Sequence, residues 1–211
     1  MKKLTATNQI SKLVAWAGML GLAWVASAQN LVQNPNFTAA NGSASGSGWN
    51  SDAQGIYFYS QSPIGNICSI GWNNGDGIWQ NTGAAVQLGA SYALDVTAEV
   101  GQAPMTGLNL SFQDVTAGWT MVANRNFTFA NQTAGGNSLE TFELDIPASA
   151  LTLNVGDTIG VGVLMYESPS SQQGWAWIQN VSLTVVPEPT SLALLAMGGV
   201  GTLVAFRRRQ A

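Results

Sequence analysis

Apolar and polar residues alternate with a period of two in four segments of the chain, as in β-strands with one buried face and one wet face. In residues 91–101 the apolar set is Tyr92, Leu94, Val96, Ala98 and Val100. The other apolar sets are Leu108, Leu110 and Phe112; Phe142, Leu144 and Ile146; and Ile159, Val161, Val163 and Met165. The acidic side chains between apolar positions are expected on the wet faces as solubilising charge, namely Asp95, Glu99, Glu143 and Asp145.

Clusters of glycine, asparagine and proline separate these segments, and residues 29–186 show no convincing amphipathic helix. Short strands divided by turn residues predict an all-β domain, an antiparallel β-sandwich. Residues 39–48, AANGSASGSG, are expected to form a flexible loop. In the last expected strand, Trp175 and Trp177 share parity with Val181 and are therefore predicted to lie in the core.

Residues 1–28 have the organisation of a secretory signal peptide with an apolar helix. Three lysines precede the apolar run at 13–25, and Ala26-Ser27-Ala28 places small residues at the cleavage positions Ala26 and Ala28. We expect cleavage after Ala28, which makes Gln29 the new N-terminus. An uncleaved anchor is the alternative, but the run is shorter than the roughly 20 residues of a spanning helix.

Residues 29–186 are strongly acidic. Arg125 is the single basic residue of this span, against ten acidic residues, so the net charge is −9. A nucleic-acid-binding surface needs lysine and arginine to displace cations from phosphates. The composition therefore excludes nucleic acid as a partner and disfavours anionic lipid.

Cys68 is the only cysteine, so no internal disulfide can form. Within the sequence ICSI it alternates with polar neighbours and is expected to be a small buried hydrophobe. A cysteine that links two copies of the chain is the alternative.

The C-terminal segment has three parts, which are the Pro187-Glu188-Pro189 tripeptide, an uncharged apolar run at 191–206, and Arg207, Arg208 and Arg209. As a helix the run would be about 24 Å long, somewhat short of a hydrocarbon core of roughly 30 Å. The prolines cannot extend a helix upstream, and the arginines would stay on the cytoplasmic side. The pattern predicts a transmembrane helix at 191–206 behind an extended peptide that a processing enzyme can grip.

Residues 187–211 resemble the PEP-CTERM sorting signal, also known as an ice-binding-protein C-terminal domain. In that family the signal marks exported proteins of Gram-negative exopolysaccharide producers for a membrane exosortase. The resemblance implies exosortase and the secretion machinery as partners, an inner-membrane intermediate, and final sorting to the cell surface or the extracellular matrix of a biofilm. It carries no evidence for ice binding. The alternatives are an ordinary single-pass anchor and, less well matched because of the arginines, a GPI signal.

Two short motifs, NLVQNPNF at 30–37 and WIQNVSL at 177–183, resemble the first and last strands of galactose-binding-like jelly rolls. This group includes the family 4/9-type carbohydrate-binding modules. Many members hold a structural calcium ion through acidic residues of these motifs, where this chain has Thr38 and Gln179. A hydroxyl and an amide are poorer ligands for calcium than two carboxylates. We therefore expect no metal and no other cofactor, although backbone carbonyls leave a weak site open.

Aromatic residues with amide and carboxylate neighbours are candidates for carbohydrate binding, because a pyranose stacks its C–H face on a ring while its hydroxyls form hydrogen bonds. GWNNGDGIWQ places Trp72 and Trp79 around a polar turn, and IYFYS places Tyr57 and Tyr59 on one strand face. Trp119 completes the candidate set. The alternative for each aromatic is core packing, which is common in small sandwiches.

A catalytic role has little support in the sequence. The chain has no histidine, which excludes Ser-His-Asp and Cys-His systems and histidine-based zinc sites. Asp76, Asp114 and Glu167 lie in turn-like contexts where a glycosidase-type carboxylate pair could be placed, but their spacing does not select them. The sequence thus predicts a non-catalytic, exported surface or matrix protein that is a candidate for exopolysaccharide binding. The alternatives are a structural envelope protein without a ligand and a glycan-active enzyme.

Overall fold

The computed structural model describes residues 29–38, 48–51, 56–71, 75–103, 105–135, 138–151, 154–166 and 174–186. The expected signal peptide and the expected sorting segment lie outside these residues, as does most of the expected loop at 39–48. Asn30–Val186 forms one compact unit. Within the described residues, no helix has the length and apolar character needed to cross a membrane.

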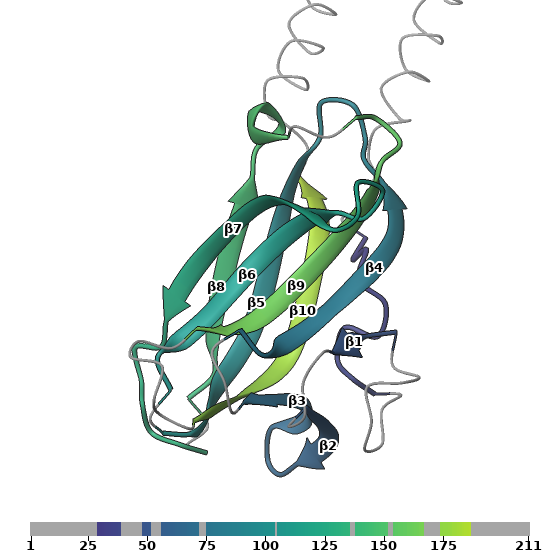
Figure 1. Cartoon of the computed structure of the whole chain (residues 1–211). Coiled ribbons are helices and arrows are strands. Elements are labelled where there is room, and N and C mark those ends of the chain that lie inside the picture. Colours follow the sequence, from purple (N-terminus) through teal and green to yellow (C-terminus); the bar gives the residue numbers. More distant parts are fainter. Residues whose placement is uncertain are drawn as a thin grey trace, which may run out of the picture. The chain divides into compact units, whose positions relative to one another are not determined.

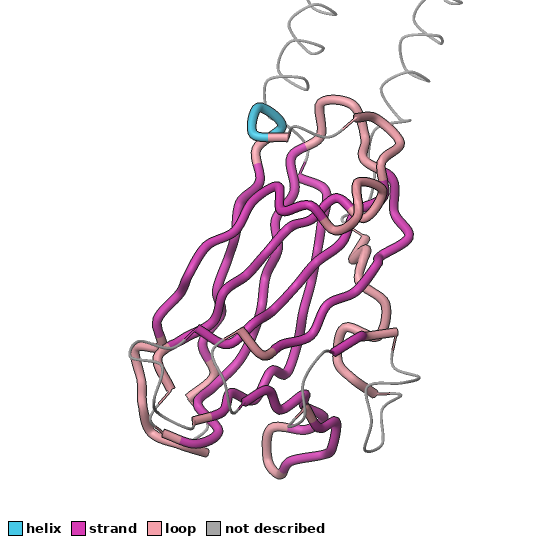
Figure 2. Tube along the Cα trace, viewed as in Figure 1, coloured by secondary structure: helices cyan, strands magenta, loops and turns pink. Residues whose placement is uncertain are grey.

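The described unit consists of ten strands and one 3-10 turn, η1 (Ala148–Ala150). The strands are β1 (Asn50–Ser51), β2 (Tyr57–Gln61), β3 (Gly65–Gly71), β4 (Gly77–Ala85), β5 (Ser91–Gln102), β6 (Gly107–Asp114), β7 (Thr120–Thr128), β8 (Glu140–Ile146), β9 (Thr158–Tyr166) and β10 (Trp175–Val186). Figure 2 shows that strands dominate the trace and that the short helix lies at one end.

The strands form two five-stranded sheets with antiparallel pairing throughout. The front sheet of Figure 1 has the order β1-β4-β9-β6-β7, and the back sheet has the order β2-β3-β10-β5-β8. This arrangement confirms the predicted all-β fold with two antiparallel sheets.

The core lies between the two sheets and contains the apolar side chains that the alternation assigned to it. None of the fifteen residues in the four predicted apolar sets is more than 7% exposed. Tyr92 of β5 and Phe112 of β6 join the two sheets across the core, with ring centroids 5.4 Å apart. Cys68 is also fully buried, as predicted, and burial raises the pKa of its thiol well above the usual value.

The predicted core position of Trp175 and Trp177 is wrong. A β-bulge between Ile178 and Asn180 shifts the register of β10 against β5. The bulge puts two successive residues opposite one residue of the partner strand, so the side-chain parity reverses there. Ala176 and Ile178 consequently fill the core, and the two tryptophans are half-buried on the outer face of the back sheet.

The segment at 30–37, expected to form a first strand, runs along β10 without being a regular strand. Leu31 N donates to Leu183 O at 2.8 Å, and Val181 N donates to Pro35 O at 3.0 Å. Asn34 and Phe37 have positive φ angles of 48° and 55°, which interrupt the extended backbone. The two motifs that carried the jelly-roll resemblance therefore contact each other, although only the second is a strand.

Candidate functional site

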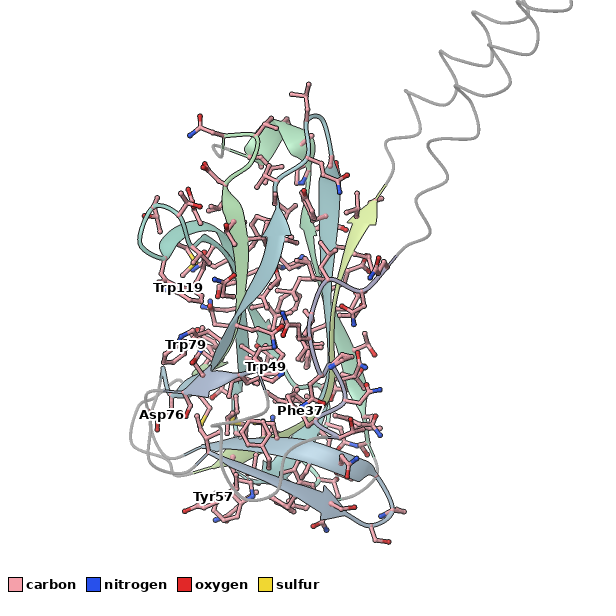
Figure 3. The ribbon with its side chains drawn as sticks, turned by 90° about the vertical axis from the view of Figure 1, so that its right-hand side faces the viewer. Phe37, Trp49, Tyr57, Asp76, Trp79 and Trp119 are labelled. Atoms are coloured by element: carbon pink, nitrogen blue, oxygen red, sulfur yellow. The ribbon has the colours of Figure 1, made fainter. Side chains whose placement is uncertain are left out.

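Trp79 and Trp119, two of the candidate sugar-binding residues, lie on the outer face of the front sheet. Trp79 follows the buried Ile78 on β4, so its side chain points away from the core and is half-buried. Trp119 lies in the turn between β6 and β7 and is also half-buried. Figure 3 shows both indoles on the same side of the sandwich, with Asp76 near Trp79.

The Trp119 backbone has a φ of 66°, a conformation that bulky residues rarely adopt. Such a conformation costs about 1–3 kcal/mol and persists only where the surrounding structure enforces it. Strain of this kind concentrates at binding and catalytic sites. The turn that carries Trp119 is therefore a candidate for function beyond connecting two strands.

Two glycines of β9, Gly160 and Gly162, lie in the sheet beneath the side chains of this face. A Cβ atom at Gly160 would lie 2.8 Å from Trp119 Cζ3, and one at Gly162 would lie 2.5 Å from Ser111 Oγ. Trp79 is directly opposite Gly162 in the β4–β9 pair. The alternation IGVGV thus gives β9 a buried valine face and an outer face without side chains, against which Trp119 packs.

Uncharged polar groups continue this face across β6 and β7. Ser111 Oγ donates to Gly162 O at 3.3 Å, and Gln113 Nε2 donates to Ser111 Oγ at 3.0 Å. Asn109 Nδ2 donates to Asn126 Oδ1 at 2.6 Å. The amides of Asn109, Gln113 and Asn126 carry both hydrogen-bond donors and acceptors, whereas the Ser111 hydroxyl is fully buried and serves to fix Gln113. We call this set the front face; it consists of Trp79, Trp119, Asn109, Ser111, Gln113 and Asn126.

The structure does not bring all five candidate aromatics together. Tyr57 and Tyr59 lie on β2 of the back sheet, so they face away from Trp79 and Trp119. Tyr57 is 54% exposed. Burial raises the pKa of Tyr59, and its neighbours Ser69 and Trp177 offset part of this rise. Trp72 lies outside the described residues.

Glu99, expected on a wet strand face as solubilising charge, is only 1% exposed. It points outward from β5 but lies opposite Trp177 of β10. Its Oε2 atom accepts a hydrogen bond from Ser138 N at 3.0 Å. The wet-face prediction is thus wrong for Glu99, because the neighbouring indole and the segment before β8 cover it. Asp95 is half-buried, and Glu143 and Asp145 are exposed as predicted.

One signal in the sequence could have placed the two tryptophans on the outer face. In WAWIQNVSL, the apolar positions change from even numbers at Ala176 and Ile178 to odd numbers at Val181 and Leu183. The polar pair Gln179-Asn180 marks the change, and a change of parity inside one strand indicates a bulge. Nothing comparable marks Glu99, whose burial depends on a segment distant in sequence.

The acidic residues considered for catalysis have separate roles or positions. Asp114 is 7% exposed, and its Oδ1 atom accepts a hydrogen bond from Ala117 N at 3.0 Å, which fixes the turn before Trp119. Asp76 directly precedes β4, and its carbonyl accepts a hydrogen bond from Met165 N at 2.7 Å. Glu167 lies outside the described residues. Among the described residues, no three histidine, cysteine or acidic side chains form a metal-binding group.

The residues at the positions where similar jelly rolls hold calcium form hydrogen bonds with neighbouring residues. Gln179 Nε2 donates to Ile64 O, Asn180 Nδ2 donates to Asn36 Oδ1, and Thr38 Oγ1 donates to Asn34 Oδ1. A hollow beside these contacts is lined by Asn36, Ile64, Asn66, Gln179 and Asn180, none of which carries a charge. The Asn180–Asn36 bond joins the two motifs, and the residues around the hollow supply amide and carbonyl groups but no carboxylate, which makes them poorer calcium ligands than two acidic residues.

Comparison with known proteins identifies the C-terminal segment and the fold. Residues 185–209 match the PEP-CTERM protein-sorting motif. The match contains Pro187, Glu188, Pro189 and the three arginines, and it implies export and sorting to the cell surface through an exosortase. No curated protein matches the sequence significantly.

Several solved structures share the sandwich. The Stig cyclase Fisc from Fischerella sp. TAU matches with a TM-score of 0.55 and 16% identity, over 76% of this chain and 99% of the cyclase. The arabinose-bound MgGH51 α-L-arabinofuranosidase gives 0.54 and 13%, over 75% of this chain and 26% of the enzyme, so this chain spans about a quarter of it. A candidate sugar binding protein from Bacteroides thetaiotaomicron gives 0.52 and 15%, over 75% and 100%.

These likenesses, with sequence identities from 13% to 16%, show the fold alone. Carbohydrate-binding modules named CBM4, CBM28 and CBM15 are also matched, with TM-scores of 0.46, 0.49 and 0.49. The expected sandwich fold is confirmed by the matches with TM-scores above 0.5. Those matches include two enzymes and a candidate sugar binding protein, so the fold does not distinguish binding from catalysis.

Proposed function

We propose that this protein is an exosortase-sorted surface or matrix protein whose sandwich binds an exopolysaccharide without cleaving it. The sorting motif at 185–209 supports export and processing. The observation that supports the binding function is the front face, where Trp79 and Trp119 lie on the same side of the sandwich beside the glycines of β9 and a set of uncharged amides. Two indoles with hydrogen-bonding groups on the same face suit a chain of neutral sugars, whose rings stack and whose hydroxyls both donate and accept.

The charge of the domain narrows the class of polysaccharide. All six front-face side chains are neutral. The net charge of residues 29–186 is −9. A polyanionic glycan would be repelled by the domain as a whole and would find no lysine or arginine among the front-face residues. The front face is therefore assigned to a neutral polysaccharide.

Affinity electrophoresis tests this function with the full chain in gels that contain hydroxyethylcellulose, xylan, laminarin or alginate. At least one neutral gel is expected to retard the wild-type protein, and alginate is not. Trp79→Ala and Trp119→Ala should each weaken retention about 30-fold, because a stacked tryptophan at the centre of an interface contributes about 2 kcal/mol or more.

Leu88→Ala is the control, because Leu88 is 81% exposed in the turn between β4 and β5 and is not one of the front-face residues. It should migrate like the wild type in every gel. If no gel retards the wild type or any variant, the result would favour a structural envelope protein without a ligand. Release of reducing sugar from any of these polymers would instead establish a glycan-active enzyme.

A further inference from the structure

The outer face of the back sheet carries a second set of aromatic and polar side chains. We call it the back-face cluster; it consists of Tyr57, Tyr59, Trp175, Trp177 and Glu99. The strand register places Tyr57 opposite Ser69, Ser69 opposite Trp177, and Trp177 opposite Glu99. One row of side chains thus crosses β2, β3, β10 and β5.

Two buried polar atoms of this row have no hydrogen-bond partner within the described residues. Glu99 Oε1 has no donor, although Glu99 Oε2 is satisfied by Ser138 N. Trp177 Nε1 likewise has no hydrogen-bond partner, although the Tyr59 side chain lies near enough to interact with that of Trp177. Buried polar groups are nearly always paired, so each unpaired atom needs an explanation, such as a bound molecule.

The hydrogen-bonding properties of Glu99 Oε1 and Trp177 Nε1 determine which ligand group can pair with both atoms. The carboxylate oxygen only accepts and the indole N–H only donates, and their residues are directly opposite on neighbouring strands. A hydroxyl group accepts from the indole and donates to the carboxylate at the same time. An ammonium cannot accept, and a second carboxylate cannot donate. The pair is therefore complementary to a hydroxyl.

The surroundings of the pair are shaped by glycine. A Cβ atom at Gly101 would lie 2.5 Å from both Trp175 Cδ1 and Trp177 Nε1, and one at Gly71 would lie 2.5 Å from Trp175 Cβ. Both indoles can contact the sheet only because these positions lack side chains. Tyr57, at the edge of the cluster, presents its ring to solvent with 54% of its surface exposed.

We propose that the back-face cluster is a second carbohydrate-binding site, in which a sugar hydroxyl bridges Trp177 Nε1 and Glu99 Oε1 and Tyr57 stacks on the same glycan. The inference rests on the proposed function and extends it. The two outer faces of a sandwich point in opposite directions, so one molecule with two such sites holds two glycan chains. The protein then cross-links polysaccharide instead of merely coating it.

The test is isothermal titration of the full chain, in mild detergent, with cellohexaose, xylohexaose and laminarihexaose. For a hexasaccharide that binds, the wild type should show two sites per chain. Trp177→Phe keeps the ring and removes the N–H, and Glu99→Gln keeps the shape and replaces one oxygen by a donor. Each should lower the affinity of one site at least tenfold and leave the Trp79 site unchanged.

Tyr57→Ala provides a variant at an exposed position, where folding is not at risk, and it should weaken the same site. Each variant's thermal melt establishes that it is folded. One site that is lost in Trp79→Ala and unaffected by all three back-face variants would overturn the second site and leave the proposed function intact. That result would assign the bridging hydroxyl to a trapped water. No binding of any hexasaccharide, together with no retention in the gels, would overturn both.

Discussion

Adding one methyl group at Gly160 tests whether the front face is built as described. In Gly160→Ala the new Cβ would lie 2.8 Å from Trp119 Cζ3 and 2.8 Å from Val115 Cγ2. Ordinary contact begins near 3.4 Å, so the indole has to move by about 0.6 Å. Overpacking of this kind costs about 1–3 kcal/mol. Replacing glycine by alanine also restricts the unfolded chain, which offsets about 0.4–1 kcal/mol.

The net expectation is a loss of about 1–2 kcal/mol in the free energy of unfolding. Urea denaturation of the full chain, followed by circular dichroism of the strands, measures it. In a Trp119→Ala background the ring is absent, so the cost of Gly160→Ala should be smaller by about 0.5 kcal/mol or more, a coupling typical of residues in contact. An equal cost in both backgrounds would refute the contact between Trp119 and β9.

Three further substitutions test the fold and its electrostatics. Tyr92→Phe removes the hydroxyl that accepts a hydrogen bond from Gln87 N at 3.0 Å, and it should cost about 1 kcal/mol in urea denaturation; an unchanged midpoint would contradict this bond. Ile178→Ala should cost about 2–5 kcal/mol because Ile178 is fully buried, and Trp175→Ala should cost clearly less; the reverse order would contradict the bulge. Asp145→Asn should raise the melting temperature at pH 7 but not at pH 3, and a rise at both would point to a cause other than charge. The pKa of Asp95 is raised by burial and then by Asp145, and that of Glu143 is raised by Asp145 and then by Asp95. Folded-state pKa values above those of the unfolded chain mean that stability falls as pH rises through the acid range.

The sandwich could be predicted from the sequence because apolar and polar residues that alternate with a period of two directly indicate which side chains of a strand are buried. Each apolar set, such as Ile159, Val161 and Val163, needs only its own strand to define a buried face. The prediction is wrong at β10, because a single bulge residue reverses the side-chain parity and the alternation does not continue across Gln179. The apolar positions are even-numbered before Gln179 and odd-numbered after it, and this change of parity indicates the bulge.

The candidate site could be predicted only in part. The polar turn in GWNNGDGIWQ makes Trp79 a candidate, Trp119 is a further candidate aromatic, and the structure places both on one face. Tyr57 and Tyr59, which the sequence predicts on one strand face, lie on the other sheet, because the order of strands in the sheets is not visible in local sequence. The burial of Glu99 could not be predicted from local sequence, because the residues that cover it, Trp177 and Ser138, are both distant from it in the sequence.

The most direct measurement of carbohydrate binding at the front face is the set of indole N–H signals in the NMR spectrum, recorded while the retained polysaccharide is added as soluble fragments. The signals of Trp79 and Trp119 should shift progressively and saturate together, while that of Trp49, which is 2% exposed in the core, stays in place. Fragments that bind without moving the Trp79 and Trp119 signals would contradict the assignment of this face.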